Sequence, residues 1–213
     1  MIRLVMFDWD GTIVDGLELN YRIYSEITRR LGKKMPGSPE DLAKLTDGTW
    51  EELYYNLGIR TREEMEKAKE IYIEMSGRLK NEVRIFPGIR DVLSSLKGRG
   101  IRTAVISNGE REVIEIHLEK MDIDQFIDQI IAHEDSERIK PNPDQIHLCL
   151  ERLGVKPEEA IFVGDMTNDI KAARNANLSK VIAVTYGWHT RERLGKLKPD
   201  VIVDRAEDIL ENL

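Results

Sequence analysis

The sequence predicts an α/β protein: an open parallel sheet with helices on both faces and a small α-helical domain inserted after the first strand. Two observations support this fold class. Short, continuous apolar runs alternate with helix-type segments along most of the 213-residue chain, a pattern typical of parallel strands buried on both faces. One long stretch, from residue 16 to residue 82, carries helical stripes of apolar residues and contains no convincing strand.

The expected strands are continuous apolar runs that end at small or acidic residues. They are Leu4–Phe7, Ile101–Ile106, Ile127–Ala132, Ile161–Val163, Val181–Val184 and Val201–Val203. The helices expected in the same part of the chain are Ile89–Gly98, Glu110–Met121, Pro143–Leu153, Asn168–Ala176 and Arg191–Leu197. Glycines at positions 98 and 154 stop two of them. Strand alternating with helix predicts parallel crossovers and therefore an open, Rossmann-like sheet.

The inserted stretch carries two stripes of apolar side chains at helical spacing. The stripes are Leu17, Tyr21, Tyr24, Ile27 and Leu31, then Met65, Ala68, Tyr72, Met75 and Leu79. We interpret both as packing faces. The expected organisation is an α/β core of residues 1–15 and 83–213 with a helical cap of residues 16–82. The expected hinges are Asp15–Gly16 and Arg84–Gly88.

Composition restricts the classes of partner and compartment. The chain has 32 basic and 39 acidic residues, and the net charge of −7 disfavours nucleic acid and anionic membranes as partners. No apolar run approaches the ~18 residues of a membrane span, and Asp8 interrupts the first run too early for a secretory signal. The single cysteine, Cys149, excludes an intramolecular disulfide and suits a reducing cytoplasm. Composition leaves a monomer and a homodimer equally open.

The first chemical motif follows the first strand directly and reads Asp8-Trp9-Asp10-Gly11-Thr12. Asp8 and Asp10 are two residues apart, so their side chains point the same way while the backbone stays extended. Two close carboxylates need a cation or strong donors to remain ionised together. Gly11 permits a tight turn and a close approach of backbone to a ligand. The alternative is a surface turn rich in Asp and Gly.

A second acidic motif, Gly164-Asp165-Met166-Thr167-Asn168-Asp169, follows the strand expected at Ile161–Val163. Asp165 lies at a strand end, where a metal-binding role is favoured. Asp169 lies where a helix begins, so complementing the helix dipole is an equal alternative for that residue.

Two further motifs carry polar groups suited to an anion. Ser107-Asn108 lies between a strand and a helix, where a hydroxyl, an amide and free N–H groups suit a phosphate, although a simple helix cap is the alternative. Lys140 stands between that pair and the second acidic motif, followed by Pro141 and Pro143. Taken alone, it reads as an exposed loop lysine.

The argument for a single site comes from convergence. Three of these motifs lie at the carboxyl ends of expected strands, and Lys140 lies in the connection after another. Those ends share one edge of a parallel sheet, where ligands bind in open α/β folds. Four carboxylates, one lysine and two anion donors at one edge predict a divalent cation together with a phosphate. Oxygen ligands favour Mg²⁺.

The ordered motif set resembles the haloacid dehalogenase-like hydrolase superfamily. The motifs that carry this resemblance are Asp8-x-Asp10-Gly11-Thr12, Ser107-Asn108, Lys140-Pro141 and Gly164-Asp165-x-x-x-Asp169. The chain also resembles the phosphoglycolate phosphatase-like branch, through Asp10-Gly11-Thr12-Ile13-Val14-Asp15, Phe86-Pro87-Gly88 and Lys140-Pro141-Asn142-Pro143. The resemblance spans the whole chain, including the helical insertion.

The resemblance implies a role for each motif. Asp8 would attack phosphorus to form an aspartyl-phosphate, and Asp10 would act as general acid and then general base. Mg²⁺ would be held by the Asp8 carboxylate, the Asp10 backbone carbonyl and Asp165, with Asp169 in the second shell. The phosphoryl group would be bound by Lys140, Ser107, Asn108, Gly11 and Thr12.

The expected function is therefore a Mg²⁺-dependent phosphatase acting on a small phosphorylated metabolite, with phosphoglycolate as the leading candidate. A phosphomutase of the same superfamily is the nearest alternative, and a non-catalytic metabolite-binding module is a more distant one. Dehalogenating relatives lack an acid at the position of Asp10, so the resemblance favours hydrolysis of a phosphate ester over dehalogenation. A second anionic group of the substrate could meet the turn at Thr46–Glu52 or Arg22, although an ordinary capped helix is the stronger interpretation of that turn.

Overall fold

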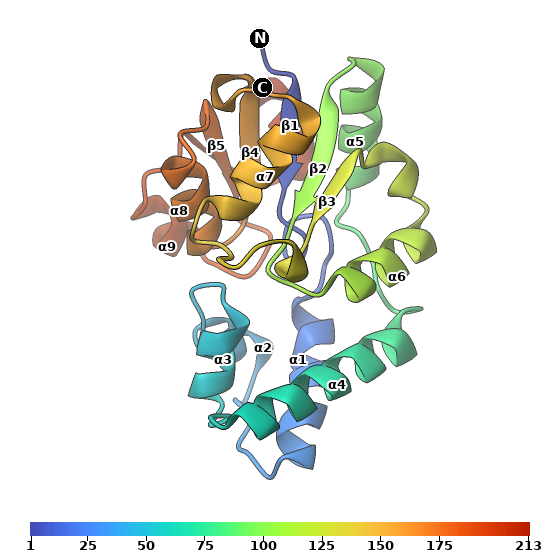
Figure 1. The fold of residues 1–213 in the computed structure, drawn as a ribbon, viewed down its shortest axis with the longest axis vertical. Helices are drawn as coiled ribbons and strands as arrows, with labels where there is room; N and C mark the ends of the chain where they lie inside the picture. Colours follow the sequence, from blue (N-terminus) through green and yellow to red (C-terminus); the bar gives the residue numbers. More distant parts are fainter.

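The computed structural model describes residues 1–213 as a single parallel sheet with helices around it and a helical layer below it (Figure 1). The sheet has six strands in the order β3-β2-β1-β4-β5-β6, and every neighbouring pair is parallel. The strands are β1 Leu4–Phe7, β2 Arg102–Ile106, β3 Gln129–Ile131, β4 Ala160–Gly164, β5 Lys180–Val184 and β6 Val201–Val203. All six expected apolar runs therefore form strands, and the α/β fold class is confirmed.

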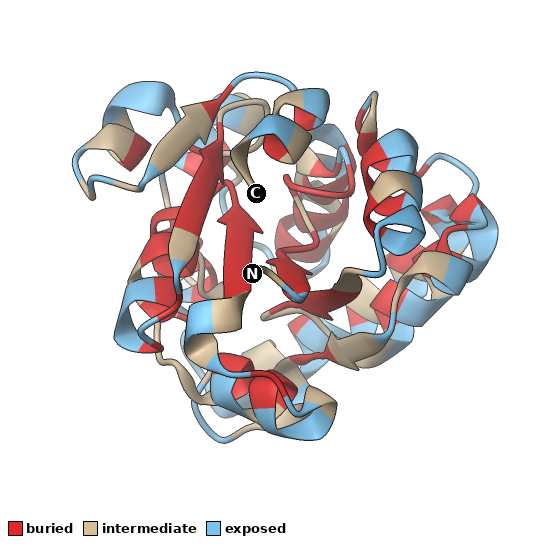
Figure 2. Cartoon of the chain, turned by 90° about the horizontal axis from the view of Figure 1, so that it is seen from above, coloured by how far each residue is buried: buried red, intermediate tan, exposed pale blue.

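Helices cover both faces of the sheet because alternate residues of each strand point to opposite sides. Val5 and Phe7 of β1 belong to one apolar cluster with α5 (Ile89–Gly98) and α6 (Arg111–Met121). The second cluster contains the other β1 residues, α7 (Asp144–Leu153) and α8 (Thr167–Asn175). Seen from above, the strands are buried and the outer faces of the helices are exposed (Figure 2). Cys149 lies in the second cluster and is fully buried, as a packing residue would be.

Four helices lie between β1 and α5 and form the layer below the sheet in Figure 1. They are α1 Leu17–Arg30, α2 Pro39–Ala43, α3 Trp50–Asn56 and α4 Arg62–Leu79. Helices α1 and α4 carry the two stripes of the sequence, and α4 begins with a capping box between Thr61 and Glu64. We call α1–α4 the cap and the remainder the core.

The two connections between cap and core run side by side. Asp15 N–H donates to the Arg84 carbonyl at 2.9 Å, and Phe86 N–H donates to the Ile13 carbonyl at 3.0 Å. The carboxyl ends of the strands face the cap (Figure 1), so the loops after β1, β2 and β4 lie at the boundary between the two layers. This arrangement places the sequence motifs against the cap.

Some elements depart from the sequence-based expectation. Helix α2 and the 3-10 helix Ala206–Asn212 are not among the expected elements, and both are short or irregular. Helix α9 spans Arg191–Gly195 and stops before the expected end at Leu197. Helix α2 begins at Ser38, whose hydroxyl accepts from the Asp41 N–H, with a proline in its first turn. No helix of the chain combines the length and the apolar character needed to cross a bilayer.

Candidate active site

Lys140 is the centre of the site, and it is buried rather than exposed. Its side chain is 1% exposed, and its ammonium donates to Asp8 Oδ1 at 2.5 Å, Asp169 Oδ1 at 2.7 Å and the Ile106 carbonyl at 2.9 Å. All three donors of the ammonium are therefore used. Burial lowers the pKa of Lys140, but the Asp169 and Asp8 carboxylates outweigh that effect and raise it above its ordinary value. The lysine is a fixed positive charge between two carboxylates.

Asp8 occupies the middle of the rim because β1 is the central strand, paired with β2 on one side and β4 on the other. Its backbone N–H donates to the Val163 carbonyl at 2.9 Å, so the first residue after the strand is still held by the sheet. Asp165, the first residue after β4, lies next to it.

Asp165 is fully buried and has a hydrogen bond to each carboxylate oxygen. Thr12 Oγ1 donates to Oδ1 at 2.9 Å, and the Trp188 N–H donates to Oδ2 at 2.7 Å. Gly11 has φ +89°, and a Cβ there would come within 2.2 Å of Asp165 Oδ2. Glycine is therefore needed both for the turn and for the close approach of the first motif to the second.

Asp8, Asp165 and Asp169 form a compact acidic cluster. They offer carboxylate oxygens that all lie within 4.8 Å of one another, and all three residues are buried. Burial raises the pKa of each carboxyl, and Asp8 adds repulsion at Asp165, whereas Lys140 offsets part of the effect at Asp8 and Asp169. One lysine cannot balance three ionised carboxylates in a dry site. The donor set and its excess negative charge fit a hard divalent cation with oxygen ligands.

Asp10 points away from this cluster and toward the cap. Its Oδ1 accepts from the amide of Asn20, on α1, at 3.2 Å, and Asn20 Oδ1 accepts from the hydroxyl of Tyr72, on α4, at 2.8 Å. The Asn20 amide also donates to the Gly16 carbonyl at 3.0 Å, an acceptor that fixes its nitrogen end toward the carboxylate. Burial raises the pKa of Asp10 to about 6, against the lowering effect of Asn20 and Lys140. A carboxyl with that pKa can exchange a proton near neutral pH.

The Ser107–Asn108 motif supports Lys140 as well as facing the site. Asn108 donates to the Lys140 carbonyl at 2.9 Å and accepts from the Lys140 N–H at 3.0 Å. The hydroxyl of Ser107 accepts from the Gly109 N–H at 3.0 Å. The backbone N–H groups of Asp10 and Asn108 make no hydrogen bond within the protein. They remain available to an anion.

A cavity of about 360 Å³ connects these groups with the cap. From the core it is lined by Asp8, Asp10, Ser107, Asn108, Lys140 and Trp188. From the cap it is lined by a set of aromatic and apolar side chains and by polar ones: Asn20, Thr46, Thr49, Arg62, Glu66 and Lys69. The reactive carboxylates therefore lie at one end of a chamber whose other end belongs to α1, α3 and α4.

The cap touches the core through the turn before α3. The Gly48 carbonyl accepts from the amides of Asn108 at 2.8 Å and Asn168 at 2.7 Å. Gly48 has φ +112°, and a Cβ there would come within 2.3 Å of the Asn168 side chain. The Asp47 carboxylate accepts from Arg193 at 2.6 Å and from the hydroxyl of Thr167 at 3.1 Å. This turn joins the two layers.

Of the two anion contacts considered from the sequence, Arg22 is not supported by the structure. Arg22 forms an exposed bidentate pair with Glu82 and is absent from the cavity lining, because α1 turns that face toward solvent. The turn at Thr46–Glu52 begins a capped helix and also lines the cavity, through Thr46, Gly48, Thr49 and Trp50, so its role as an anion contact stays a prediction. Thr49 caps α3, and its nearby N–H groups at Asp47 and Gly48 bond within the turn itself.

The remaining predicted residues lie together, and several others join them. Asp8, Asp10, Gly11, Thr12, Ser107, Asn108, Lys140, Asp165 and Asp169 all lie at the carboxyl edge of the sheet. Asn20, Tyr72 and Trp188 are further neighbours that sequence reasoning missed. Tyr72 belongs to a stripe interpreted as packing, and Trp188 follows β5 in the aromatic run Tyr186-Gly187-Trp188. The position of Trp188 shortly after a strand is the feature of the sequence that could have placed it at the carboxyl edge of the sheet.

Known proteins resemble the chain over nearly its whole length. The family model described as haloacid dehalogenase-like hydrolase matches residues 5–184. The pyrophosphatase PpaX of Bacillus cereus (strain G9842) is 29% identical over 212 residues, covering 98% of this chain and 95% of the relative. The phosphoglycolate phosphatase of Escherichia coli O157:H7 is 29% identical over 234 residues, covering 100% and 92%.

Solved structures resemble the fold as closely. A predicted phosphoglycolate phosphatase from Haemophilus somnus 129PT superposes with a TM-score of 0.89 at 25% identity, covering 99% of this chain and 97% of that one. The shared part includes the cap as well as the core.

Proposed function

The chain belongs to the haloacid dehalogenase-like hydrolase family, and we propose that it is a Mg²⁺-dependent phosphatase that works through an aspartyl-phosphate on Asp8. The enzyme class, a phosphatase hydrolase, follows from the relatives and their shared fold. The observation that supports the mechanism is the position of Lys140, shared by Asp8 and Asp169 beside Asp165, with Asp10 on the cap side.

In the first half-reaction, a carboxylate oxygen of Asp8 attacks phosphorus while the bond between phosphorus and the leaving oxygen breaks. Asp10, protonated on a fraction of molecules near neutral pH, gives its proton to the leaving oxygen. The product alcohol leaves, and Asp8 carries the phosphoryl group. Asn20 and Tyr72 hold the Asp10 carboxylate in place for that transfer.

In the second half-reaction, Asp10 takes a proton from a water molecule that attacks phosphorus. The bond between Asp8 and phosphorus breaks, which restores the carboxylate and releases inorganic phosphate. The free N–H groups of Asp10 and Asn108, together with the Ser107 hydroxyl, bind phosphoryl oxygens, and Lys140 contributes fixed positive charge.

A divalent ion would be held by the carboxylates of Asp8 and Asp165 and the backbone carbonyl of Asp10, with Asp169 beside it. When bound, the ion offsets the charge of the acidic cluster and of the incoming phosphate, which lets two anions meet. Asp169 accepts from Lys140 at 2.7 Å and from the Met166 N–H at 2.9 Å, and we assign it to the second shell, as the family resemblance implies.

The substrate class that we propose is a small phosphorylated metabolite of the cytoplasm. Phosphoglycolate and pyrophosphate are the compounds that the names of relatives of 29% identity suggest for comparison. A phosphomutase would form an isomeric sugar phosphate instead of free phosphate, and a binding module would form neither. Incubation with a panel of phosphate esters, analysed for both products, separates the three possibilities.

Metal removal tests the cation directly. Excess chelator should abolish phosphate release from p-nitrophenyl phosphate, and added Mg²⁺ should restore it, because the acidic cluster repels phosphate when no cation is bound. Full activity in excess chelator would remove the metal from the proposal.

A further inference from the structure

The cap side of the cavity contains a cluster of aromatic and apolar side chains, beside polar residues that include Asn20, Thr49, Arg62, Glu66 and Lys69. The cluster consists of Tyr24, Trp50, Leu53, Tyr54, Met65 and Tyr72. The rings contact one another: Trp50 and Tyr54 have centroids 5.3 Å apart, Tyr24 and Tyr54 6.2 Å, and Tyr24 and Tyr72 5.8 Å. Such offset and edge-on arrangements leave ring faces and edges that suit a further ring. We call these six residues the aromatic wall.

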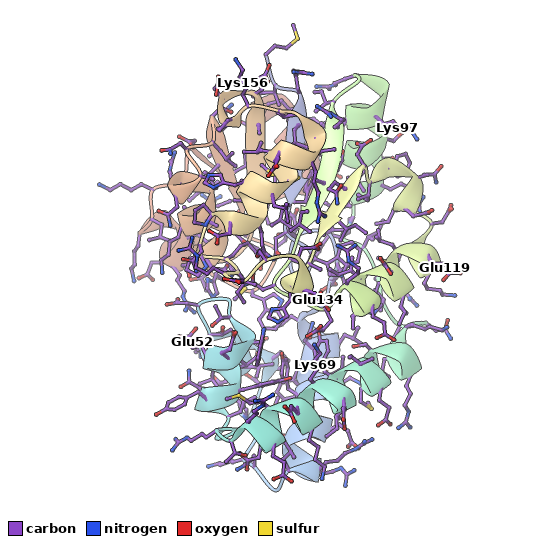
Figure 3. All side chains as sticks on the ribbon, viewed as in Figure 1. Glu52, Lys69, Lys97, Glu119, Glu134 and Lys156 are labelled. Atoms are coloured by element: carbon purple, nitrogen blue, oxygen red, sulfur yellow. The ribbon has the colours of Figure 1, made fainter.

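The cations beside the aromatic wall are already paired. Lys69, on α4, forms an ion pair with Glu110 of the core at 2.8 Å, and Figure 3 shows Lys69 and Glu134 on the two sides of that boundary. Arg62 pairs with Glu66 at 2.9 Å in the exposed part of the lining. Every cation of the cavity lining, Arg62, Lys69 and Lys140, therefore already has a carboxylate partner. The six side chains of the wall carry no charge themselves, so the wall favours a neutral group over one that carries its own negative charge.

The wall does offer neutral polar groups. The hydroxyls of Tyr21, Tyr72 and Tyr186 donate hydrogen bonds within the protein, whereas those of Tyr24 and Tyr54 make none. The Tyr24 and Tyr54 hydroxyls are therefore available to a ligand. The cavity volume of about 360 Å³ lies in the range of pockets that hold drug-sized ligands. A phosphoryl group at Asp8 with only a few atoms behind it would leave most of this space unfilled.

We propose that the aromatic wall is a subsite for an uncharged aromatic ring in the leaving group, so that the preferred substrates are ring-bearing phosphate monoesters. The inference rests on the proposed function, because the phosphoryl group must lie at Asp8 for the remainder to reach the wall. It predicts that phosphoglycolate and pyrophosphate are the poorer substrates. The ring packs against Trp50 and Tyr54, and the tyrosine hydroxyls accept or donate to its polar substituents.

The test compares alkyl phosphates whose leaving groups differ little in reactivity. Benzyl phosphate, cyclohexylmethyl phosphate, ethyl phosphate and phosphoglycolate are hydrolysed with Mg²⁺, and kcat/KM is measured for each. We expect benzyl phosphate to exceed ethyl phosphate and phosphoglycolate by on the order of tenfold or more, and to exceed the cyclohexyl ester by a smaller factor. Equal values for benzyl and ethyl phosphate, or a preference for phosphoglycolate, overturn the proposal.

Neighbouring tyrosines on α3 supply a matched pair of variants. Tyr54 is 4% exposed and belongs to the wall, whereas Tyr55 is 57% exposed and faces solvent. Tyr54→Leu should reduce the ratio of benzyl to ethyl kcat/KM several-fold, and Tyr55→Leu should leave it unchanged. Trp50→Leu, at a half-buried position, gives a second test if the Tyr54 variant is poorly folded. An unchanged ratio in both wall variants contradicts the proposal.

Binding of a non-hydrolysable probe separates this inference from the proposed function. Calorimetry with benzylphosphonate and ethylphosphonate in the presence of Mg²⁺ should give the same ring preference, and Trp50→Leu should reduce it. Ring-selective binding without turnover of any ester would contradict the proposed function and support the subsite. Turnover of all esters without ring selectivity would support the function and overturn the subsite.

Discussion

The two ends of the cavity differ in the interactions that hold their side chains in place. At the core end, one ammonium, three carboxylates and a set of backbone groups are fixed by hydrogen bonds, and burial with mutual repulsion shifts their pKa values. At the cap end, rings and a thioether pack against one another with few polar contacts. Groups that move charge need fixed geometry, whereas groups that select a leaving group need only shape and polarity. The difference assigns the chemistry to the core and substrate choice to the cap.

Asp8→Asn gives the largest expected effect and tests the core end alone. It should reduce phosphate release by roughly 10³-fold or more, because a carboxamide oxygen is a poor nucleophile. The rate is measured on p-nitrophenyl phosphate, with Asp91→Asn, at an exposed position on α5, as the control. Substantial turnover in the Asp8 variant would refute the nucleophile and leave the core without its proposed role.

Lys140→Met should destabilise the core by about 3–5 kcal/mol, because it leaves two buried carboxylates without their positive partner. Denaturant unfolding measures the change. Added Mg²⁺ should recover more stability in this variant than in the wild-type protein, since the ion binds the same carboxylates. Equal Mg²⁺ responses of the two proteins would show that the cluster does not hold the ion.

The boundary between the two regions should depend on pH through Glu110. Burial and the contact with Glu134 raise the pKa of Glu110 to about 7, although Lys69 opposes the shift. Between pH 4.5 and 7 the folded protein therefore binds a proton that the unfolded chain releases. The stabilisation that Glu110 gives the folded state is complete below pH 4.5 and declines as the pH rises to 7. Thermal unfolding measured across that pH window should show the free energy of unfolding falling by about 1 kcal/mol, a figure discounted for the partial exposure of Glu110.

Glu110→Gln should flatten that pH dependence, because the amide does not titrate. A similar slope in the variant and the wild-type protein would place the titrating group elsewhere.

Tyr72→Phe gives the smallest effect and tests the link between the two ends. Without the hydroxyl, the Asn20 side chain keeps its bonds to Asp10 and the Gly16 carbonyl but loses the third, and we expect kcat to fall by about fivefold to tenfold, the value of one hydrogen bond. The KM for ethyl phosphate should stay nearly constant, and the acidic limb of the kcat–pH profile should move. A change in KM alone would reduce Tyr72 to a packing residue of the wall.

Much of the fold could be predicted from local patterns. All six strands follow from apolar runs, and α5 matches its expected bounds because Gly88 and the apolar spacing of Ile89–Gly98 define it. Helix α2 was missed because five residues give too few turns for a periodic signal. The 3-10 helix at Ala206–Asn212 was missed although Ala206, Ile209 and Leu210 have helical spacing, because seven residues span only about two turns.

The site was predictable to a different degree at its two ends. Asp8, Asp165 and Asp169 could be grouped because strand ends of a parallel sheet share one edge. Arg22 was considered as an anion contact and instead pairs with Glu82. The role of Tyr72 was hidden, since an aromatic residue in an apolar stripe looks the same whether it faces a core or a cavity.

The sequence by itself determined which residues follow each strand, and therefore which charged groups reach the common edge. Only the tertiary structure decided that Lys140 is shared between Asp8 and Asp169, that Asp10 turns toward Asn20, and that the cap presents rings to the cavity. The physical reason is the distance along the chain over which each feature is determined. Strand polarity and helix periodicity are fixed by neighbours a few residues away, whereas the direction of a buried side chain is fixed by whatever packs against it from distant parts of the chain.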